Sequence, residues 1–428
     1  MHARWRRGRE IARAVSVGGV LAGAVGEGFA SSRPVEVEAA SDGLARGSAV
    51  LTAPDASSTF GVAVAAWGDW IAVGDDRAAD GLVESGRVHL HRRSPRGAWP
   101  RIETISGADA TPFDRFGATV SISEDHLLVG APGPDGVGGG RAEVFALQQG
   151  RWVPEAVLEA PGVEPLDRYG AAVAICGTLA VVAAPRRDGP GLDAGGVAVF
   201  LREASGWSDG IWLEAPDAAA GDRFGTSVAT DGERIVVGAI GDDDFGEKSG
   251  SAWVFRQVDG VWQAESKLLP PHGAAREWFG HAVAIDGTHV LVGAPRASSQ
   301  GTSSGAVWAF AREDGDWSIT SSVPAIDGRS GDWFGFALAI DGGDAIAGSP
   351  GRDVLGDGVE LEDVGDGVLL SRLGRRWRGE RREQIDWRDT VRLRGSSVAI
   401  SKRAIVVGHL PVEDGPVVPG EVWVVSRP

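Results

Sequence analysis

Short apolar runs with a two-residue period dominate the chain from residue 48 onward. In the stretch 279–310, FGHAVAIDGTHVLVGAPRASSQGTSSGAVWAF, the first run covers 282–285, an Asp286-Gly287 turn follows, and further runs cover 290–292 and 306–310. Alternating runs separated by Asp-Gly turns are typical of antiparallel strands joined by hairpins. The pattern therefore predicts a β-meander, and no run is long enough to predict a stable helix.

The same pattern recurs along the chain with a fixed internal spacing. Each copy begins with an aromatic-Gly pair, and a second small marker residue follows 13 residues after that glycine. A slip of one residue would turn the apolar face of a strand outward, so the constant spacing indicates one hairpin register in every copy. The pairs are Phe60-Gly61, Phe116-Gly117, Tyr169-Gly170, Phe224-Gly225, Phe279-Gly280 and Phe334-Gly335, with Arg394-Gly395 as a degenerate seventh; the second markers are Gly74, Gly130, Ala183, Gly238, Gly293, Gly348 and Gly408. We interpret these marker residues as structural.

A third glycine, a tryptophan and a fourth apolar run complete each copy. The third glycines are Gly86, Gly140, Gly196, Gly250, Gly305, Gly367 and Gly420; the tryptophans are Trp99, Trp152, Trp207, Trp262, Trp317 and Trp377. Four strands in about 55 residues, repeated seven times, predict an all-β fold, a seven-bladed β-propeller with four-stranded blades. The copies begin near residues 60, 116, 169, 224, 279, 334 and 394.

The two ends of the repeat region predict how the ring closes. The seventh copy has no fourth run, whereas residues 49–54, AVLTAP, match residues 156–161, AVLEAP, at five of six positions. We therefore expect the N-terminal strand to complete the last blade, which removes unpaired sheet edges. The propeller is then one domain, residues 48–428.

The residues before the propeller indicate export. Five arginines precede a mostly apolar, glycine-rich run at 14–25, so residues 1–30 have the form of a secretory signal peptide, and residues 31–47 form a flexible leader. The formal net charge of −17 disfavours nucleic acid and anionic lipid as partners. The single Cys176 excludes an intramolecular disulfide, and its apolar neighbours predict a buried side chain. We expect a secreted, periplasmic or cell-surface protein with no membrane span after signal removal.

The repeats resemble the FG-GAP repeats of the integrin alpha-chain β-propeller and of many exported bacterial proteins. The resemblance covers about nine tenths of the chain and rests on the Phe-Gly pairs, on Val-Gly-Ala-Pro at 129–132 and 292–295, and on the Gly-x-Val/Ala-x-x-Phe that follows. In integrin-like members, calcium loops of the form Asp-x-Asp-x-Asp-Gly join the first two strands. Here that connection is a tight turn, as at Asp231-Gly232, with too few oxygens to surround Ca²⁺. Integrin-type calcium sites are therefore not transferred.

Acidic residues gather instead between the second and third strands of several copies. The densest group is Asp242, Asp243 and Asp244. We interpret these loops as solvated, with a calcium site at Asp242, Asp243 and Asp244 as the alternative; no other cofactor is expected. A second recurrent carboxylate stands two residues before each aromatic, and we expect it to accept backbone N–H groups of the turn entering the innermost strand. The alternative is a ring of carboxylates near the channel mouth. These residues are Asp114, Asp167, Asp222, Glu277 and Asp332.

No catalytic constellation emerges from the sequence. The stretch 301–305, GTSSG, matches a nucleophile elbow but leads into a strand, and His89 and His91 are expected on an exposed strand without a third ligand. The one break in the repeat is an insertion within 355–366 of the sixth copy. We therefore predict an exported, non-catalytic binding or adhesion module that presents acidic loops to an extracellular protein or glycan. The alternative is a propeller enzyme acting on glycans, a hydrolase or lyase with carboxylates on the loop face.

Overall fold

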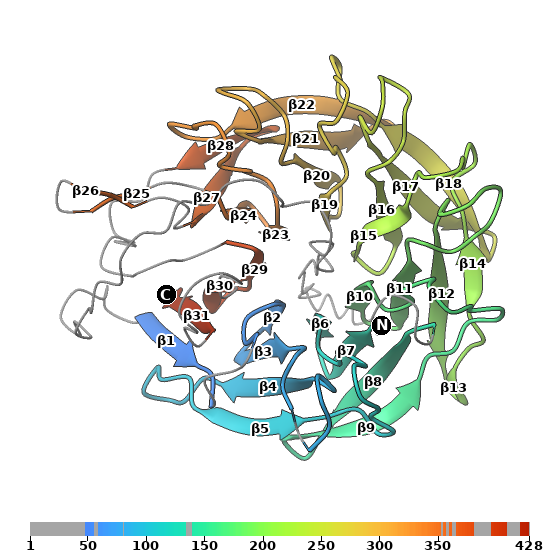
Figure 1. Cartoon of the computed structure of the whole chain (residues 1–428), viewed down its shortest axis with the longest axis vertical. Helices are drawn as coiled ribbons and strands as arrows, with labels where there is room; N and C mark the ends of the chain where they lie inside the picture. Colours follow the sequence, from blue (N-terminus) through green and yellow to red (C-terminus); the bar gives the residue numbers. More distant parts are fainter. Residues whose placement is uncertain are drawn as a thin grey trace, which may run out of the picture.

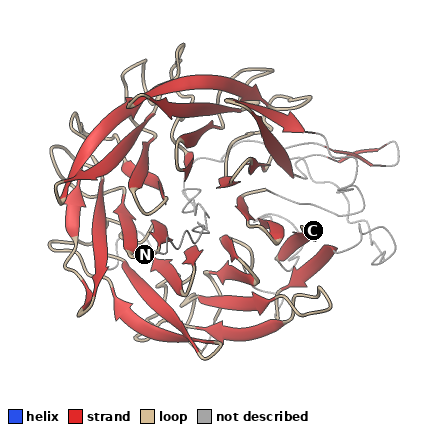
Figure 2. Ribbon diagram, turned by 180° about the vertical axis from the view of Figure 1, so that it is seen from behind, coloured by secondary structure: helices blue, strands red, loops and turns tan. Residues whose placement is uncertain are grey.

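The chain forms a ring of antiparallel sheets around a central axis (Figure 1). The computed structural model describes residues 48–54, 59–79, 81–133, 139–351, 354–356, 359–361, 365–380, 395–408 and 420–427. These residues contain strands, turns and loops and no helix (Figure 2). The predicted seven-bladed β-propeller is therefore confirmed. The predicted signal peptide and leader lie outside the described residues.

Each blade runs outward from the axis through strands that we call A, B, C and D. Blade 1 consists of β2 (Val64–Trp67), β3 (Trp70–Asp75), β4 (Arg87–Arg92) and β5 (Arg101–Ile105). Blade 2 consists of β6 (Thr119–Ser123), β7 (His126–Ala131), β8 (Arg141–Gln148) and β9 (Arg151–Val157). Blade 3 consists of β10 (Ala172–Cys176), β11 (Leu179–Ala184) and β12 (Gly196–Glu203), with β13 (Gly206–Trp207) and β14 (Ile211–Leu213) sharing the outer position.

The remaining blades repeat this order. Blade 4 consists of β15 (Phe224–Thr230), β16 (Arg234–Ala239), β17 (Ser251–Val258) and β18 (Val261–Leu268). Blade 5 consists of β19 (Ala282–Asp286), β20 (His289–Ala294), β21 (Ala306–Glu313) and β22 (Asp316–Pro324). Blade 6 consists of β23 (Leu338–Asp341), β24 (Asp344–Ser349), β27 (Asp366–Leu373) and β28 (Arg376–Glu380), and β25 (Val354–Gly356) pairs with β26 (Val359–Leu361) between β24 and β27. Blade 7 consists of β29 (Ser397–Ile400), β30 (Ala404–Gly408), β31 (Glu421–Ser426) and β1 (Ser48–Thr52).

The N-terminal strand closes the ring, as predicted. β1 pairs with β31 from Ser48 opposite Val425 to Thr52 opposite Glu421, and Leu51 is buried in this seam. The next seam is bridged as well, because Trp99 of blade 1 donates from Nε1 to Ser426 Oγ at 3.3 Å. The first and last described strands thus share one sheet.

The repeat spacing corresponds to one hairpin register throughout the ring. Thr119 pairs with Gly130 in blade 2 and Ala282 with Gly293 in blade 5, and the other blades keep the same offset. The aromatic that begins each copy is also used alike: Phe60, Phe116, Tyr169, Phe224, Phe279 and Phe334 are at most 2% exposed. Five of them form parallel bridges to the preceding blade, with Gly86, Gly140, Gly195, Gly250 and Gly305. In blade 3 the bridging glycine is Gly195, and the third marker Gly196 opens the C strand as predicted.

The second marker lets neighbouring blades approach closely. A Cβ on Gly238 would lie 1.9 Å from the carbonyl oxygen of Gly280 in the next blade, and a Cβ on Gly408 would lie 2.3 Å from that of Gly61. Only glycine fits at such a distance without movement of the backbone. In blade 3 this position is occupied by Ala183 instead of glycine. In the next blade, β15 begins at Phe224, and its pairing with β16 shifts register between Phe224 and Ser227.

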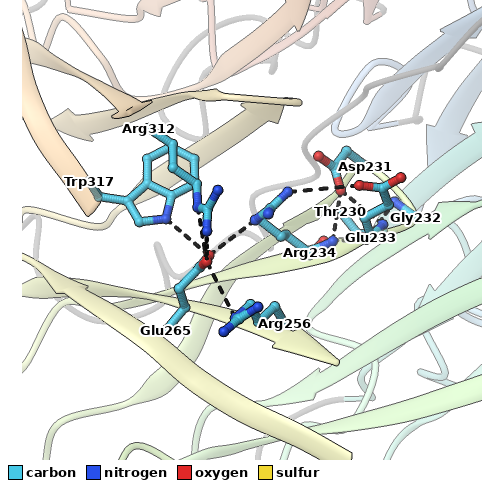
Figure 3. A network of polar contacts seen from close by, with 9 residues as sticks. All are labelled: Thr230, Asp231, Gly232, Glu233, Arg234, Arg256, Glu265, Arg312 and Trp317. Atoms are coloured by element: carbon cyan, nitrogen blue, oxygen red, sulfur yellow. Dashed lines mark hydrogen bonds and ion pairs between the residues drawn. The ribbon is translucent and has the colours of Figure 1, made fainter. Parts of the chain in front are cut away.

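Polar contacts join the outer strands of neighbouring blades. Figure 3 shows the contact between blades 4 and 5, where Glu265 of β18 accepts hydrogen bonds from Trp317 Nε1 at 3.1 Å and Arg312 Nε at 2.9 Å. Arg234, which is in blade 4 like Glu265, donates from Nε to the Glu265 carboxylate at 3.0 Å. Glu155 makes the equivalent contacts to Trp207 and Arg202 between blades 2 and 3. The tryptophan of each copy thus lies at a seam between blades.

Three further predictions concern single side chains. Cys176 is buried, as expected. The expectation that His89 and His91 lie on an exposed strand was wrong, because they are 0% and 5% exposed and pack against Phe60 with ring centroids 5.3 and 6.4 Å away. A third strand in a propeller blade is covered by the neighbouring blades on both faces, so its alternation does not expose one side. Among the described residues, no helix is long and apolar enough to span a membrane.

Candidate functional site on the loop face

The two ends of the propeller carry different connections. The hairpin turns from A to B and from C to D lie at one end, because the strands of each blade are antiparallel. The B-to-C loops and the connections between blades lie at the other end, which we call the loop face. Loops held on a rigid scaffold are where proteins most often place binding residues.

The carboxylates that precede each aromatic organise the turns entering the blades. Asp222 Oδ2 accepts the backbone N–H of Ala219 at 2.7 Å, three residues earlier in the chain. The same bond recurs at Asp114 with Thr111, Asp167 with Glu164 and Asp332 with Arg329. These contacts agree with the expected role in satisfying backbone N–H groups. Each carboxylate therefore has a structural partner within its own turn.

A cluster of acidic side chains around one lysine lies on the loop face of blade 4. Lys267 Nζ is 2.7 Å from Asp217 Oδ2, 2.8 Å from Asp242 Oδ2 and 2.6 Å from Asp244 Oδ2. Asp242 is buried, whereas Asp217 and Asp244 are about half-exposed. Burial lowers the pKa of Lys267, but its hydrogen bonds to the three aspartates outweigh this and raise the pKa. The Lys267 ammonium group thus offsets the negative charge of the three carboxylates.

The structure brings together only two of the three predicted metal ligands. Asp243 Oδ1 accepts the backbone N–H of Lys248 at 2.7 Å and does not join the cluster. Carboxylate oxygens of Asp217, Asp242 and Asp244 lie within 4.8 Å of one another and form the donor set that suits a cation. Ca²⁺ takes six to eight oxygens, so these donors fit it only with the lysine displaced and with additional oxygens.

A further carboxylate next to the cluster titrates in an unusual range. Burial, together with the negative charges of Asp242 and Asp217, raises the pKa of Asp222 to about 6. Lys267 and the N–H of Ala219 act in the opposite direction. The loop face of blade 4 therefore holds one carboxyl group, that of Asp222, with a raised pKa.

Sequence reasoning missed Asp217 and Lys267. Asp217 lies in the connection from blade 3, and Lys267 lies on β18, 50 residues later. No local spacing links them, because the contact depends on how two blades stack. Within the sixth-blade insertion that broke the repeat, the structure describes residues 355–356, 359–361 and 365–366, and none of these belongs to the cluster.

Comparisons with known proteins agree with the repeat analysis. The model of the FG-GAP repeat matches residues 99–145, 152–200, 207–255 and 262–310. Each match starts at the tryptophan of one copy and ends in the C strand of the next blade. The sequence matches no curated protein. Among solved structures, a hypothetical selenium-binding protein from Sulfolobus tokodaii is similar at 12% identity, covering 73% of this chain and 74% of that one with a TM-score of 0.43, a likeness too distant to support an argument.

The matched repeats and the observed architecture point to the same family. The repeat model covers four consecutive units, and the unmatched blades keep the same hairpin register. The chain is thus a seven-bladed β-propeller in which the FG-GAP repeat is matched at four positions.

Proposed function

We propose that this chain is an exported, non-catalytic binding or adhesion module whose loop face holds an extracellular protein or glycan. The observation that carries the proposal is how the recurrent residues are used. The aromatics of the first six copies, the marker glycines and the carboxylates at Asp114, Asp167, Asp222 and Asp332 serve packing or backbone hydrogen bonds. The loops of the loop face differ in length and charge from blade to blade, as expected of a scaffold that presents a binding surface. FG-GAP repeats are typical of extracellular proteins, which supports export.

The proposal is tested by a binding screen of the purified full chain against immobilised glycans and extracellular matrix proteins. The same preparations are assayed for release of reducing ends or unsaturated sugars. We expect saturable binding to at least one ligand and no turnover. Turnover of a bound glycan contradicts the proposal.

A glycan hydrolase or lyase is the second candidate, and Asp222 is the observation that favours it. A carboxyl group with a pKa raised to about 6 has the property required of a general acid. If the chain is an enzyme of this kind, Asp222→Asn abolishes turnover while leaving the turn intact, because the amide oxygen still accepts the Ala219 N–H. If the chain is a binding module, this variant keeps its ligand affinity.

We also propose that Ca²⁺ binds weakly at the acidic cluster of blade 4. An added ion has to displace Lys267 from Asp242 and Asp244, and this competition lowers its affinity. We therefore expect calcium to stabilise the wild-type chain only slightly, and the effect to map to this cluster rather than to the A-to-B turns.

A further inference from the structure

Two positions of the repeat change character in blades 5 and 6. The residue just before the aromatic-Gly pair is arginine in blades 2, 3 and 4 but tryptophan in blades 5 and 6: Arg115, Arg168, Arg223, Trp278 and Trp333. The residue just after the pair is small in the earlier blades and becomes an aromatic ring here: Ala118, Ala171, Thr226, His281 and Phe336. Packing of the repeat does not require these changes, because blades 2 to 4 form without them.

The four changed side chains meet in one continuous row. Trp278 stacks on His281 with ring centroids 6.0 Å apart and planes within 7°. His281 contacts Phe336 of the next blade at 4.4 Å, and Phe336 stacks on Trp333 at 6.3 Å with planes within 17°. His281 and Phe336 are buried, and Trp278 and Trp333 are half-buried at the loop face. The row thus has a buried centre and two partly exposed indoles.

The two indoles differ in what covers them. The guanidinium of Arg296 lies 3.7 Å from the ring centroid of Trp278. Gly351 holds the equivalent position in blade 6: Arg296 donates its N–H to the Glu277 carbonyl, and Gly351 donates its own to the Asp332 carbonyl, each at 3.2 Å. In the described part of the chain, no cation lies over Trp333. Among the described residues, the indole of blade 6 therefore lacks the guanidinium that covers the indole of blade 5.

The B-to-C loop beside Trp333 is polar and contains no charged residue. The loop 297–304, ASSQGTSS, exposes Ser298, Gln300 and Thr302. It lies against the tryptophan, because the Ser303 carbonyl accepts the N–H of Trp333 at 3.2 Å. The corresponding loop of blade 4, residues 242–248, reads DDDFGEK. Uncharged hydroxyl and amide groups thus replace the acidic groups found one blade earlier.

We propose that the loop face of blades 5 and 6 binds a neutral oligosaccharide, with Trp333 as the stacking platform. This inference rests on the proposed binding function, and it specifies the class of ligand and the location of the binding site. The C–H face of a pyranose packs on an indole, while its hydroxyl groups need donors and acceptors. Ser298, Gln300 and Thr302 offer both, and the guanidinium of Arg296 donates to hydroxyl oxygens. The loop 297–304 itself offers no counter-charge to a charged ligand.

The test is to titrate the full chain with cellohexaose, xylohexaose, chitohexaose, mannohexaose and maltohexaose. Binding is monitored by calorimetry and by tryptophan fluorescence. We expect one of these to bind with an affinity that added salt does not change, since no ion pair is involved. Trp333→Ala then weakens binding by at least about tenfold, and Trp333→Phe weakens it less. The matched control is Trp67→Ala, because Trp67 is also half-buried but lies at the opposite end of the propeller. We expect this variant to keep the wild-type affinity. Melting curves verify that all three variants are folded.

Three outcomes overturn the proposal. These are no binding of any of the five sugars, equal affinity of Trp333→Ala and wild type, and an affinity that falls steeply as salt is added. The second outcome leaves the binding-module function standing and moves the site elsewhere. Cleavage of a bound sugar by the chain contradicts the proposed function itself, whichever residues hold the sugar.

Discussion

At the scale of single residues, the second marker glycine is demanded by the neighbouring blade rather than by its own hairpin. A methyl group at Gly238 would lie 1.9 Å from the Gly280 carbonyl oxygen, so one of the two backbones must move. We expect Gly238→Ala to lower the free energy of unfolding by about 2 kcal/mol, as overpacking in a close-packed seam does. Urea unfolding followed by tryptophan fluorescence measures this change.

The matched control for this substitution is Gly343→Ala in the A-to-B turn of blade 6. A Cβ there meets no atom within 4 Å, and its backbone does not require a positive φ. We expect this variant to be as stable as the wild type. If both alanine variants lose equal stability, the interblade contact does not explain the glycine.

The lysine at the centre of the acidic cluster provides a second test at this scale. Without Lys267, Asp217, Asp242 and Asp244 repel one another across less than 4.8 Å. We expect Lys267→Met to be destabilised in chelator and to regain stability in millimolar calcium, with a much larger calcium-dependent rise in Tm than the wild type shows. A chelator-to-calcium comparison of both proteins measures the difference, and an equal response of the two argues against any cation site here.

At the scale of elements, the outer strands are tied together by a carboxylate that serves two blades. Glu265 is 6% exposed and receives Trp317, Arg312 and Arg234. Burial raises its pKa, but the hydrogen bonds from Trp317 and Arg234 outweigh this and lower it below 4.5. Because the folded-state pKa is depressed, the stabilisation is present above the unfolded value and is lost as pH falls through the folded value.

We therefore expect Glu265→Gln to lower the free energy of unfolding by about 2 kcal/mol at neutral pH, since a buried partner of several arginines is removed. The difference from wild type should shrink in acid. Glu233→Gln is the control, because that carboxylate is 73% exposed and lies 3.9 Å from the same Arg234. Denaturation at neutral and acidic pH compares the three proteins, and a pH-independent difference contradicts this account.

The elements also show which features the sequence predicts and which it does not. Periodicity and the constant distance from Gly280 to Gly293 predict a hairpin and its register, because both are local properties of one blade. The contact of Lys267 with Asp217 depends on how two blades stack, and no spacing encodes it. The burial of His89 was mispredicted for a related reason: both faces of a C strand are covered by other blades.

The change of residue type in blades 5 and 6 is visible in the sequence, but no local spacing links the four positions. The tryptophan before Phe279 and the histidine after Gly280 are separate departures from the repeat until the structure places their rings together. Departures that coincide in neighbouring blades are thus a better indication of a site than acidic loops, which recur around much of the ring.

At the scale of the whole molecule, the propeller depends on a strand that lies at the opposite end of the chain from the blade it completes. β1 adds five residues to β31, and Leu51 contributes about 2 kcal/mol through its burial. Without β1, the backbone groups of β31 that face it lose their partners, and an unpaired edge invites association with other chains. Local packing of the other blades does not replace this contact, because each blade is held mainly by its two neighbours.

Two truncations separate this role from that of the preceding residues. We expect deletion of residues 31–55 to cause aggregation or a large loss of stability, whereas deletion of residues 31–46 leaves β1 intact and changes little. Thermal unfolding and light scattering of the two proteins measure the contrast. Equal melting temperatures would show that the seam between β1 and β31 does not hold the ring closed. A selective loss in the longer deletion, reversed by adding a peptide with the sequence of residues 48–54, would show that the closing strand acts through its pairing with β31.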